Sequence, residues 1–383
     1  MPIRATIARW SDRVLPLWFA VWSLVRLQQL GLFDGDWTWF GRDFRIYRDA
    51  GLAILNGTDP WDAADHWNGQ DWHFAAPPTA AQAFVPFALL PETLGLAVFL
   101  VVTVGVFAFA MRRLRLPLWW LVFPPVAEGV GAANPQILAF ALLIVGGPVI
   151  AAPIGRAIAS ALKVYAVVPV VARREWRALV AVAVLFGLSV VLAPGLWSTY
   201  LSRFGEIGAR LASESHGGVS AALVLDPKVF GTLLGTSEDV ARLAGIALFG
   251  LIAALVVLVA IRDVPSAGWL AVPLLWPAAE YHAAAFVVPI ARRLSMWIIA
   301  VPTIPTYLLG LIVLAYEAAA GVRALPEESP PIGLRAWLTT LGPSLRTAFG
   351  PTDDAGAARQ HPVANEPPTP EVRPADTPPP PAS

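Results

Sequence analysis

Long apolar runs separated by short polar interruptions make up most of the chain. Four runs approach or exceed the length of a bilayer-spanning helix, about 20 residues. They are Val14–Phe33, Thr93–Met111, Ala178–Ala193 and Ala241–Ile261. Shorter apolar runs, broken by glycine and proline, fill much of the remainder, and such broken backbone is tolerated at membrane depth only inside a bundle. The pattern therefore predicts an all-α polytopic membrane protein.

A polar segment from about residue 34 to residue 76 interrupts this pattern and holds eight Asp residues and no Glu. Within it, Phe44, Tyr47, Gly51 and then Ile54 or Leu55 recur every three to four residues. This spacing predicts an amphipathic helix over residues 43–55, with Gly57 at the position of a helix C-cap. We expect this helix to lie flat on the membrane surface, with its apolar side among the lipid headgroups.

The composition agrees with a membrane location. Hydrophobic residues make up 56% and charged residues 14% of the 383 residues, against about 25% charged residues in soluble domains. The formal net charge is zero and there is no cysteine. A nucleic-acid partner, a disulfide and a thiolate metal site are therefore not expected.

Clusters of arginine flank the apolar runs and set their expected orientation. They lie before the first run, at Arg4, Arg9 and Arg13, and then at Arg112/Arg113/Arg115, Arg173/Arg174/Arg177, Arg262 and Arg292/Arg293. Loops rich in Lys and Arg stay in the cytoplasm. The first run then leads outward, so we expect the Asp43 segment on the extracytoplasmic side of the plasma membrane.

We predict a transmembrane domain over residues 1–320, built of about 10–12 helices, with external loops at about 34–76 and about 194–240. The second loop is rich in Gly, Ser and mixed charges, which predicts an irregular segment with one short helix. Residues 321–383 end in "NEPPTPEVRPADTPPPPAS", which predicts a disordered cytoplasmic tail. No internal repeat is visible, which weakens the case for a transporter built of inverted repeats.

Asp43 heads the predicted amphipathic helix, where two roles are open. Asp is favoured as an N-cap, and by spacing alone this role is the more frequent one. A carboxylate fixed near the membrane surface is also placed to take a proton from an acceptor hydroxyl. Arg42, Arg45 and Arg48 either touch lipid phosphates, or one of them clamps the phosphate of a lipid-linked donor. Asp36 is a second catalytic candidate.

Each of three further ionisable residues has two possible roles. Lys163 lies within "ASALKVYAVV", where a charge is a functional candidate by default, although a lysine at a helix end can also extend its amine to the interface. His282 either serves a site or packs in the core beside Glu280. Arg203 either faces a substrate phosphate or pairs with Glu206.

Five segments between Asp43 and Pro289 carry a family resemblance. They are "DFRIYRDAGLAILNGTDPW", "FAAPPTAAQAFVPFALLP", "NPQILAFALLIV", "GRAIASALKVYAVVPVVARREWRA" and "WPAAEYHAAAFVVP". In this order they resemble the motifs of glycosyltransferase family 87, the polyprenyl-phosphate-mannose-dependent mannosyltransferases of the GT-C superfamily. The resemblance implies a GT-C membrane enzyme with an active site that opens to the extracytoplasmic side.

The resemblance also implies residue roles. Asp43 falls on the family's catalytic Asp, the general base. Lys163 falls on a family Lys that faces donor phosphate, and His282 on a late His near the active site. The chain departs from the pattern at Ala76, where the family has Tyr, and at "NPQILA", where Pro replaces Gly before the Gln and Leu replaces Asn two residues after it. These departures bear on the donor sugar and the acceptor more than on the chemistry.

We therefore predict a cell-envelope glycosyltransferase that moves a sugar, with mannose implied by the family, from polyprenyl phosphate to a lipid or glycan acceptor with inversion. The donor carries its own leaving group, so no metal and no cofactor are expected. Asp43 is the predicted catalytic residue, and the predicted substrate-binding residues are Arg42, Arg45, Tyr47, Lys163, Arg203 and His282.

Two other classes of protein compete with this prediction. In a transporter or flippase of lipid-linked or small polar substrates, the Asp43 loop would be a gate and Lys163 a coupling charge. In a non-catalytic membrane scaffold, the Pro-rich tail would recruit partners. Charges concentrated in the outer loops favour the transferase over the transporter, and the scaffold gives the Asp43 helix no purpose beyond interface packing.

Overall fold

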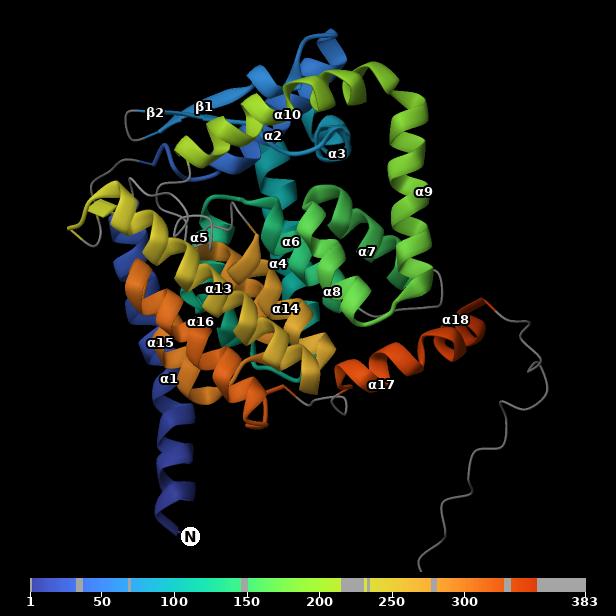
Figure 1. The fold of residues 1–383 in the computed structure, drawn as a ribbon. Coiled ribbons are helices and arrows are strands. Elements are labelled where there is room, and N and C mark those ends of the chain that lie inside the picture. Colours follow the sequence, from blue (N-terminus) through green and yellow to red (C-terminus); the bar gives the residue numbers. More distant parts are fainter. Residues whose placement is uncertain are drawn as a thin grey trace, which may run out of the picture. The chain divides into compact units, whose positions relative to one another are not determined.

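The computed structural model describes residues 2–31, 37–67, 70–145, 151–214, 231–232, 235–276, 281–326 and 332–349 (Figure 1). The chain divides into a compact unit of residues 1–341 and a second unit of residues 342–383. Helices dominate the described residues, and their only sheet is a two-stranded hairpin. The predicted class, an all-α membrane protein, is confirmed.

The N-terminal part of the bundle surrounds the Asp43 segment. Its helices and strands are α1 (Pro2–Gln29), α2 (Arg42–Asn56), the 3-10 helix η1 (Pro60–Asp62), β1 (Ala64–Trp67), β2 (Gln70–His73), α3 (Pro78–Ala88) and α4 (Glu92–Arg113). The two strands are antiparallel, with Ala64 opposite His73.

The middle of the chain is a series of short, proline-punctuated helices. They are η2 (Leu118–Val122), α5 (Pro124–Gly131), α6 (Pro135–Ile144), α7 (Ala151–Leu162), η3 (Val164–Ala166) and α8 (Val167–Ala172). Four of them carry proline in their first two positions or inside. The broken apolar runs of the sequence are thus broken helices packed inside the bundle, as expected.

The C-terminal part returns to longer helices. It contains α9 (Trp176–Leu192), α10 (Pro194–Glu214), α13 (Glu238–Arg262), α14 (Val264–Leu275), η4 (Tyr281–Ile290), α15 (Arg293–Ile299), α16 (Ile304–Ala319) and α17 (Leu334–Thr339). The helix α18 (Leu341–Phe349) falls almost wholly in the second unit.

Two described helices, α4 and α13, are long and apolar enough to cross a membrane, and α9 with α10 passes the same test as a pair bent by 101°. Each of the four predicted apolar runs contains a long helix: α1, which ends at Gln29, α4, α9 and α13. The last two residues of the first run lie outside the described residues. The remaining apolar helices have only 10–17 residues. The expected 10–12 spans are therefore not present as single long helices among the described residues.

The predicted amphipathic helix forms as α2 and ends at Gly57, a left-handed C-cap with a φ of 69°. Its apolar side does not face lipid headgroups, which corrects the expectation. Phe44 and Ala50 are fully buried, and Gly51 lies so close to α3 that an added Cβ would be 3.0 Å from the Phe84 carbonyl carbon. The apolar stripe packs on protein because α3 covers it.

The second predicted external loop is more regular than expected. Its first 21 residues form the continuous helix α10. Arg203, Glu206 and Arg210 form ion pairs at spacings of three and four residues, which support a helix along that face. Figure 1 shows α10 turning off the end of α9 to run beside the β1–β2 hairpin. Residues 215–230 lie outside the described part of the chain.

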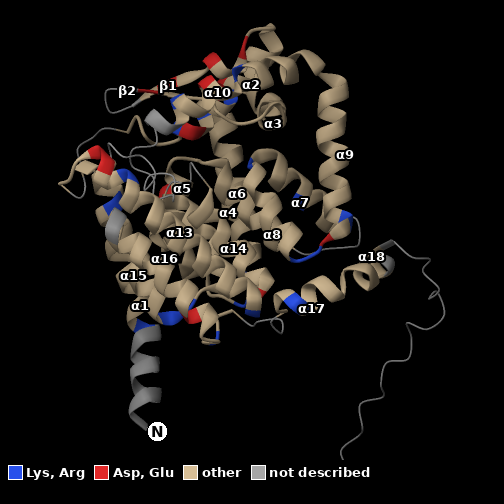
Figure 2. Ribbon diagram, in the orientation of Figure 1, with Lys and Arg blue, Asp and Glu red and all other residues tan. Residues whose placement is uncertain are grey.

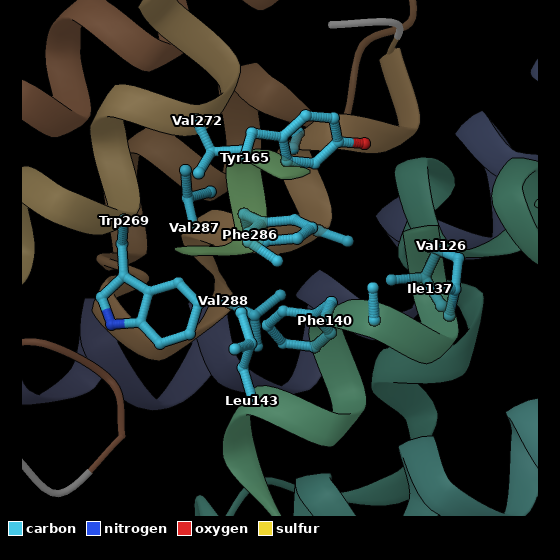
Figure 3. Close-up of a cluster of buried hydrophobic side chains, with 14 of the residues drawn as sticks. Val126, Ile137, Phe140, Leu143, Tyr165, Trp269, Val272, Phe286, Val287 and Val288 are labelled. Carbon is cyan, nitrogen blue, oxygen red and sulfur yellow. The ribbon is translucent and has the colours of Figure 1, made fainter. Parts of the chain in front are cut away.

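Aromatic side chains from distant segments form the centre of the bundle (Figure 3). The ring of Phe286 lies 5.7 Å from Phe140, 5.7 Å from Tyr165 and 6.2 Å from Trp269, measured between ring centroids. Figure 3 shows the Tyr165 hydroxyl pointing away from this apolar cluster. The cluster thus holds α6, η3, α14 and η4 together beneath the polar groups described below.

Figure 2 shows Asp and Glu positions on the ribbon near α2, the β1–β2 hairpin and α10. Two of the arginines predicted to be cytoplasmic cap helices: Arg173 donates to the Leu143 carbonyl at the end of α6 (3.3 Å), and Arg262 to the Ala319 carbonyl at the end of α16. Cations are stabilising at helix C-termini. These two arginines thus take part in helix packing, and the cytoplasmic position of the arginine clusters stays a prediction.

The predicted tail begins with a segment that packs on the bundle. α16 ends at Ala319, and the indole of Trp337 in α17 donates to the Ala172 carbonyl (2.9 Å) while Arg174 lies 4.5 Å over its ring. The Pro-rich stretch lies in residues 350–383, outside the described residues, so its disorder stays a prediction.

Gly268 and Gly250 offer a matched test of this packing. A Cβ on Gly268 in α14 would lie 2.3 Å from the Ala172 Cβ, whereas one on Gly250 in α13 would meet nothing within 4 Å. We expect Gly268→Ala to destabilise the protein by about 1–3 kcal/mol through overpacking. Gly250→Ala should be neutral or slightly stabilising. Thermal unfolding in detergent checks this, and equal midpoints for the two variants would contradict the α8–α14 contact.

Candidate active site

The N-terminus of α2 is fixed to the turn between α5 and α6. Gly41 is the N-cap, in the left-handed conformation (φ 71°) that glycine adopts readily. Its N–H donates to the Gly131 carbonyl (2.9 Å), and the Asp43 N–H donates to the Ala132 carbonyl (3.0 Å). Asp43 is therefore in the first turn of α2 and does not cap it, so the N-cap interpretation is wrong.

Asp43 is 6% exposed, and both of its carboxylate oxygens have partners. Oδ1 lies 2.8 Å from both Nε and Nη2 of the Arg42 guanidinium. Oδ2 accepts from Asn134 Nδ2 at 2.5 Å. A carboxylate oxygen can accept more than one bond, so Oδ2 retains capacity for a further donor such as a hydroxyl group.

Nearby cations keep the Asp43 carboxylate ionised. Burial alone raises the pKa of Asp43, but the positive charges of Arg42, His282 and Lys163 outweigh it, so the pKa lies below its ordinary value. α2 is not one of the candidate spans. A buried carboxylate stabilised as the anion and surrounded by cations is typical of functional sites, although structural ion pairs also produce it.

Lys163 stands where the backbone breaks between α7 and η3, with extended dihedral angles. Its ammonium group lies 5.1 Å from the centre of the Tyr47 ring. Its charge also acts on Asp43. The helix break thus holds an amine within electrostatic range of the Asp43 carboxylate.

His282 reaches the same place from η4 and is 2% exposed. Its charge acts on both Asp43 and Glu128. The structure therefore brings together four residues predicted from the sequence, Asp43, Arg42, Lys163 and His282. Glu280, the alternative partner of His282, lies outside the described residues, as does Asp36.

A second polar layer lies beside these residues. Arg26 of α1 makes a two-pronged ion pair with Glu128 of α5, with N–O distances of 2.8 and 2.9 Å. Tyr165 donates to Gln136 Oε1, and Gln136 Nε2 is buried without a partner among the described residues. The site is thus a layer of charged and amide groups above an apolar core.

Arg45 and Arg203 bind groups in the segments that flank α2. Arg45 binds Asp65 of β1 at 2.8 Å and donates to the Phe40 and Thr38 carbonyls. Arg203 of α10 pairs with Asp59 at 2.6 Å, Asp62 at 3.0 Å and Glu206 at 2.8 Å. The predicted alternative for Arg203, a pair with Glu206, is confirmed. The structure does not give either arginine a contact with Asp43.

The hairpin covers Arg42. The Arg42 guanidinium lies 4.3 Å from the centre of the Trp72 ring in β2, a distance at which cation and ring attract. Trp72 therefore holds the cation from one side while Asp43 binds it from the other.

An apolar cavity of about 370 Å³ adjoins the anchored end of α2. Trp37, Trp39 and Phe40, which precede α2, line it together with Val104 of α4 and Gly131 of α5. Gly131 is also the residue whose carbonyl accepts the Gly41 N–H. The cavity and the Asp43 cluster thus share the α5–α6 turn as a wall.

Sequence reasoning missed Asn134, Gln136 and Glu128. A signal for the first was present, because Asn followed by Pro is typical of a helix start, and Asn134 is indeed the N-cap of α6. Gln136 lies in the family segment "NPQILAFALLIV", but no role was predicted for it. Nothing local pointed to Glu128, since it matters through a partner more than 25 residues away.

Comparison with known proteins gives one match. The family model of glycosyltransferase family 87 matches residues 74–276, more than half of the 383 residues. The match contains Asn134, Gln136, Lys163 and Arg203. Asp43 precedes the start of the match, and His282 follows its end. No curated protein and no solved structure matches the chain.

The Arg26–Glu128 pair allows a stability test. The Glu128 side chain is only 9% exposed, and a buried charge left without its partner costs about 3–5 kcal/mol. We expect Arg26→Met to lower the free energy of unfolding by about that amount. The double variant Arg26→Met/Glu128→Met should recover most of the loss. Unfolding in detergent measures both, and a single variant as stable as the double one would contradict a buried pair.

Proposed function

The chain belongs to glycosyltransferase family 87, and we propose that it moves mannose from polyprenyl phosphate to a lipid or glycan acceptor on the extracytoplasmic side of the plasma membrane. Residues 1–320 would form the transferase domain, acting in cell-envelope biosynthesis. The observation that carries the proposal is the buried Asp43 carboxylate, held by Arg42 and Asn134 and flanked by the charges of Lys163 and His282. The transporter alternative gains no support from a glycosyltransferase family match.

The proposed reaction is a single displacement. The acceptor hydroxyl oxygen forms a bond to the anomeric carbon while the bond from that carbon to the phosphate oxygen breaks. The hydroxyl proton passes to Asp43, and polyprenyl phosphate leaves with the electron pair. Attack opposite the leaving group inverts the anomeric centre, as it does with a single carboxylate base in inverting glycosidases.

Asp43 acts as a general base that is ionised at neutral pH, because its pKa is held low. A base with a low pKa is weak, so its contribution comes from position and from negative charge next to the developing oxocarbenium character. Its remaining acceptor capacity would receive the hydroxyl. This places the acceptor oxygen at the N-terminus of α2.

Cations would stabilise the leaving phosphate. Lys163, His282 and Arg42 reach the Asp43 cluster from three separate elements, and fixed positive groups aimed at developing charge are a large part of catalysis in many enzymes. Gln136 Nε2, buried and without a partner among the described residues, adds a neutral donor. Tyr47 would orient Lys163 through their contact. Arg45 and Arg203 would hold the loops that enclose the substrate.

The apolar cavity supports a lipid-linked substrate. It lies between α1, α4, η2 and α5 and is walled by the residues just before α2. A polyprenyl chain entering there would bring its phosphate to the anchored end of α2. The phosphate leaving group is already part of this donor, so the proposal needs no nucleotide site and no cofactor.

Replacement of the base is the direct test. Membranes that contain the protein are supplied with radiolabelled polyprenyl-phosphate mannose and a native lipid extract. We expect Asp43→Asn to reduce transfer by at least about 100-fold, the range attributed to general base catalysis. Asp49→Asn is the matched control, because Asp49 lies on the same helix and pairs with Arg48. Undiminished transfer in Asp43→Asn, with normal insertion into the membrane, would contradict the assignment of Asp43 as the general base.

The pH profile tests the electrostatics of the same group. Since the pKa of Asp43 is lowered, kcat/KM should not fall on the acid side until below about pH 4, the ordinary Asp value. Lys163→Met removes one of the cations that lower this pKa, so the pKa rises and the acid limb should move to higher pH.

The control for the pH shift is Arg48→Met, which removes a cation of α2 whose ion-pair partner is Asp49. Its acid limb should coincide with that of the wild-type protein. An unmoved limb in Lys163→Met would show that Lys163 does not act on the base.

A further inference from the structure

The turn between α5 and α6, residues 131–134, is built to receive the start of α2. Carbonyls of Gly131 and Ala132 accept the N–H groups of Gly41 and Asp43. Ala133, which is not a glycine, adopts a left-handed conformation with a φ of 51°. Such conformations cost about 1–3 kcal/mol and persist where the surroundings impose them. The strained residue immediately precedes Asn134.

The side-chain amide of Asn134 joins two elements through its two ends. Its Oδ1 accepts the Gln136 N–H at 2.8 Å and so caps α6. Its Nδ2 donates to Asp43 Oδ2 at 2.5 Å. Rotating the amide by half a turn would set an oxygen against the carboxylate and an amine against the helix N–H. Only one orientation therefore satisfies both neighbours, and the side chain is 4% exposed.

We propose that Asn134 is a positioning residue for the transfer reaction: its amide fixes the Asp43 carboxylate so that the remaining acceptor position of Oδ2 points at the acceptor hydroxyl. This inference rests on the proposed function of Asp43. It adds a group to the site that neither the family motifs nor the charge pattern indicated.

Asn134 restrains the Asp43 carboxylate in a way that Arg42 alone cannot. Arg42 holds Oδ1, but it neighbours Asp43 on the same helix and can move with it. Asn134 belongs to a separate element, fixed by the helix that it caps and by the turn before it. A base anchored from two elements cannot rotate away, and a displacement of about 1 Å at a reacting group can cost about 100-fold in rate.

Asn134 is a neutral side chain among otherwise charged groups around Asp43. Arg42 approaches from α2, Lys163 from the start of η3 and His282 from η4. Glu128 of α5 acts on Arg42 and His282. A second carboxylate in place of the amide would add a like charge 2.5 Å from Asp43, and the two groups would then titrate as a pair with one raised pKa.

Two substitutions separate positioning from capping. Asp and Ser cap helices about as well as Asn, so Asn134→Asp and Asn134→Ser keep the cap of α6. Neither can donate as the amide does, since Asp is an acceptor when ionised and the single Ser hydroxyl is too short to bridge both neighbours. Asn134→Ala removes the cap as well and reports the purely structural contribution.

We measure kcat, KM for polyprenyl-phosphate mannose and the pH profile, together with thermal unfolding in detergent. Asn134→Asp should lower kcat by about 100-fold with little change in KM, and move the acid limb of kcat/KM upward by about one pH unit or more. Asn134→Ser should lower kcat without moving the limb. Asn134→Ser should unfold at nearly the wild-type temperature because it keeps the cap, whereas Asn134→Ala should unfold lower. Asn134→Asp keeps the cap but should also unfold lower at neutral pH, because it sets a second carboxylate against Asp43.

Wild-type kinetics in Asn134→Asp would overturn the proposal, because a merely structural Asn is replaced by an equally good cap. If the wild-type protein itself transfers no sugar, the proposed function fails, and the contact is judged by unfolding alone. Asp43→Asn, Asn134→Ser and their double variant then form a cycle. Strictly additive shifts would overturn the contact, and non-additive shifts would support it.

Discussion

The burial of one carboxylate governs the arrangement of this protein. Asp43 lies almost out of reach of solvent, and an ionised carboxylate in that position is costly unless it is paired and hydrogen-bonded. Arg42 and Asn134 meet that requirement directly, and Lys163 and His282 add positive charge from two further elements. Three of these partners follow an irregular point of the backbone: a left-handed cap at Gly41 before Arg42, a left-handed residue at Ala133 before Asn134, and a helix break at Lys163 itself.

These devices explain why so many helices are short. A bundle of uninterrupted spans could place charges only at its ends or at its apolar centre. Breaks at η3 and η4, and the proline-started helices α5 and α6, let polar side chains from the middle and the end of the chain approach the start of α2. Irregular backbone at depth is tolerated where protein covers it, and the aromatic cluster around Phe286 lies directly beneath these breaks.

The sequence predicted the elements whose signals are local. Apolar length gave α4, α9 and α13, and the spacing of Phe44 and Tyr47 gave α2 with its end at Gly57. The family resemblance pointed to Asp43, Lys163 and His282. The sequence could not show that α3 covers α2, because either lipid or protein satisfies an apolar stripe. Nor could it show which residues Arg45 binds, or that Glu128 belongs to the site. Pairs between residues far apart in the sequence leave no periodic pattern along the chain.

The sugar transfer proposed for this glycosyltransferase is a single displacement, and a single displacement has a stereochemical signature. The most direct measurement is the anomeric configuration of the product formed by the purified protein from polyprenyl-phosphate mannose labelled at its anomeric carbon, with polyprenyl phosphate quantified alongside. The account predicts an inverted anomeric centre, one polyprenyl phosphate released per sugar transferred and no sugar covalently bound to the protein. Retained configuration, or a glycosylated protein intermediate, would contradict it.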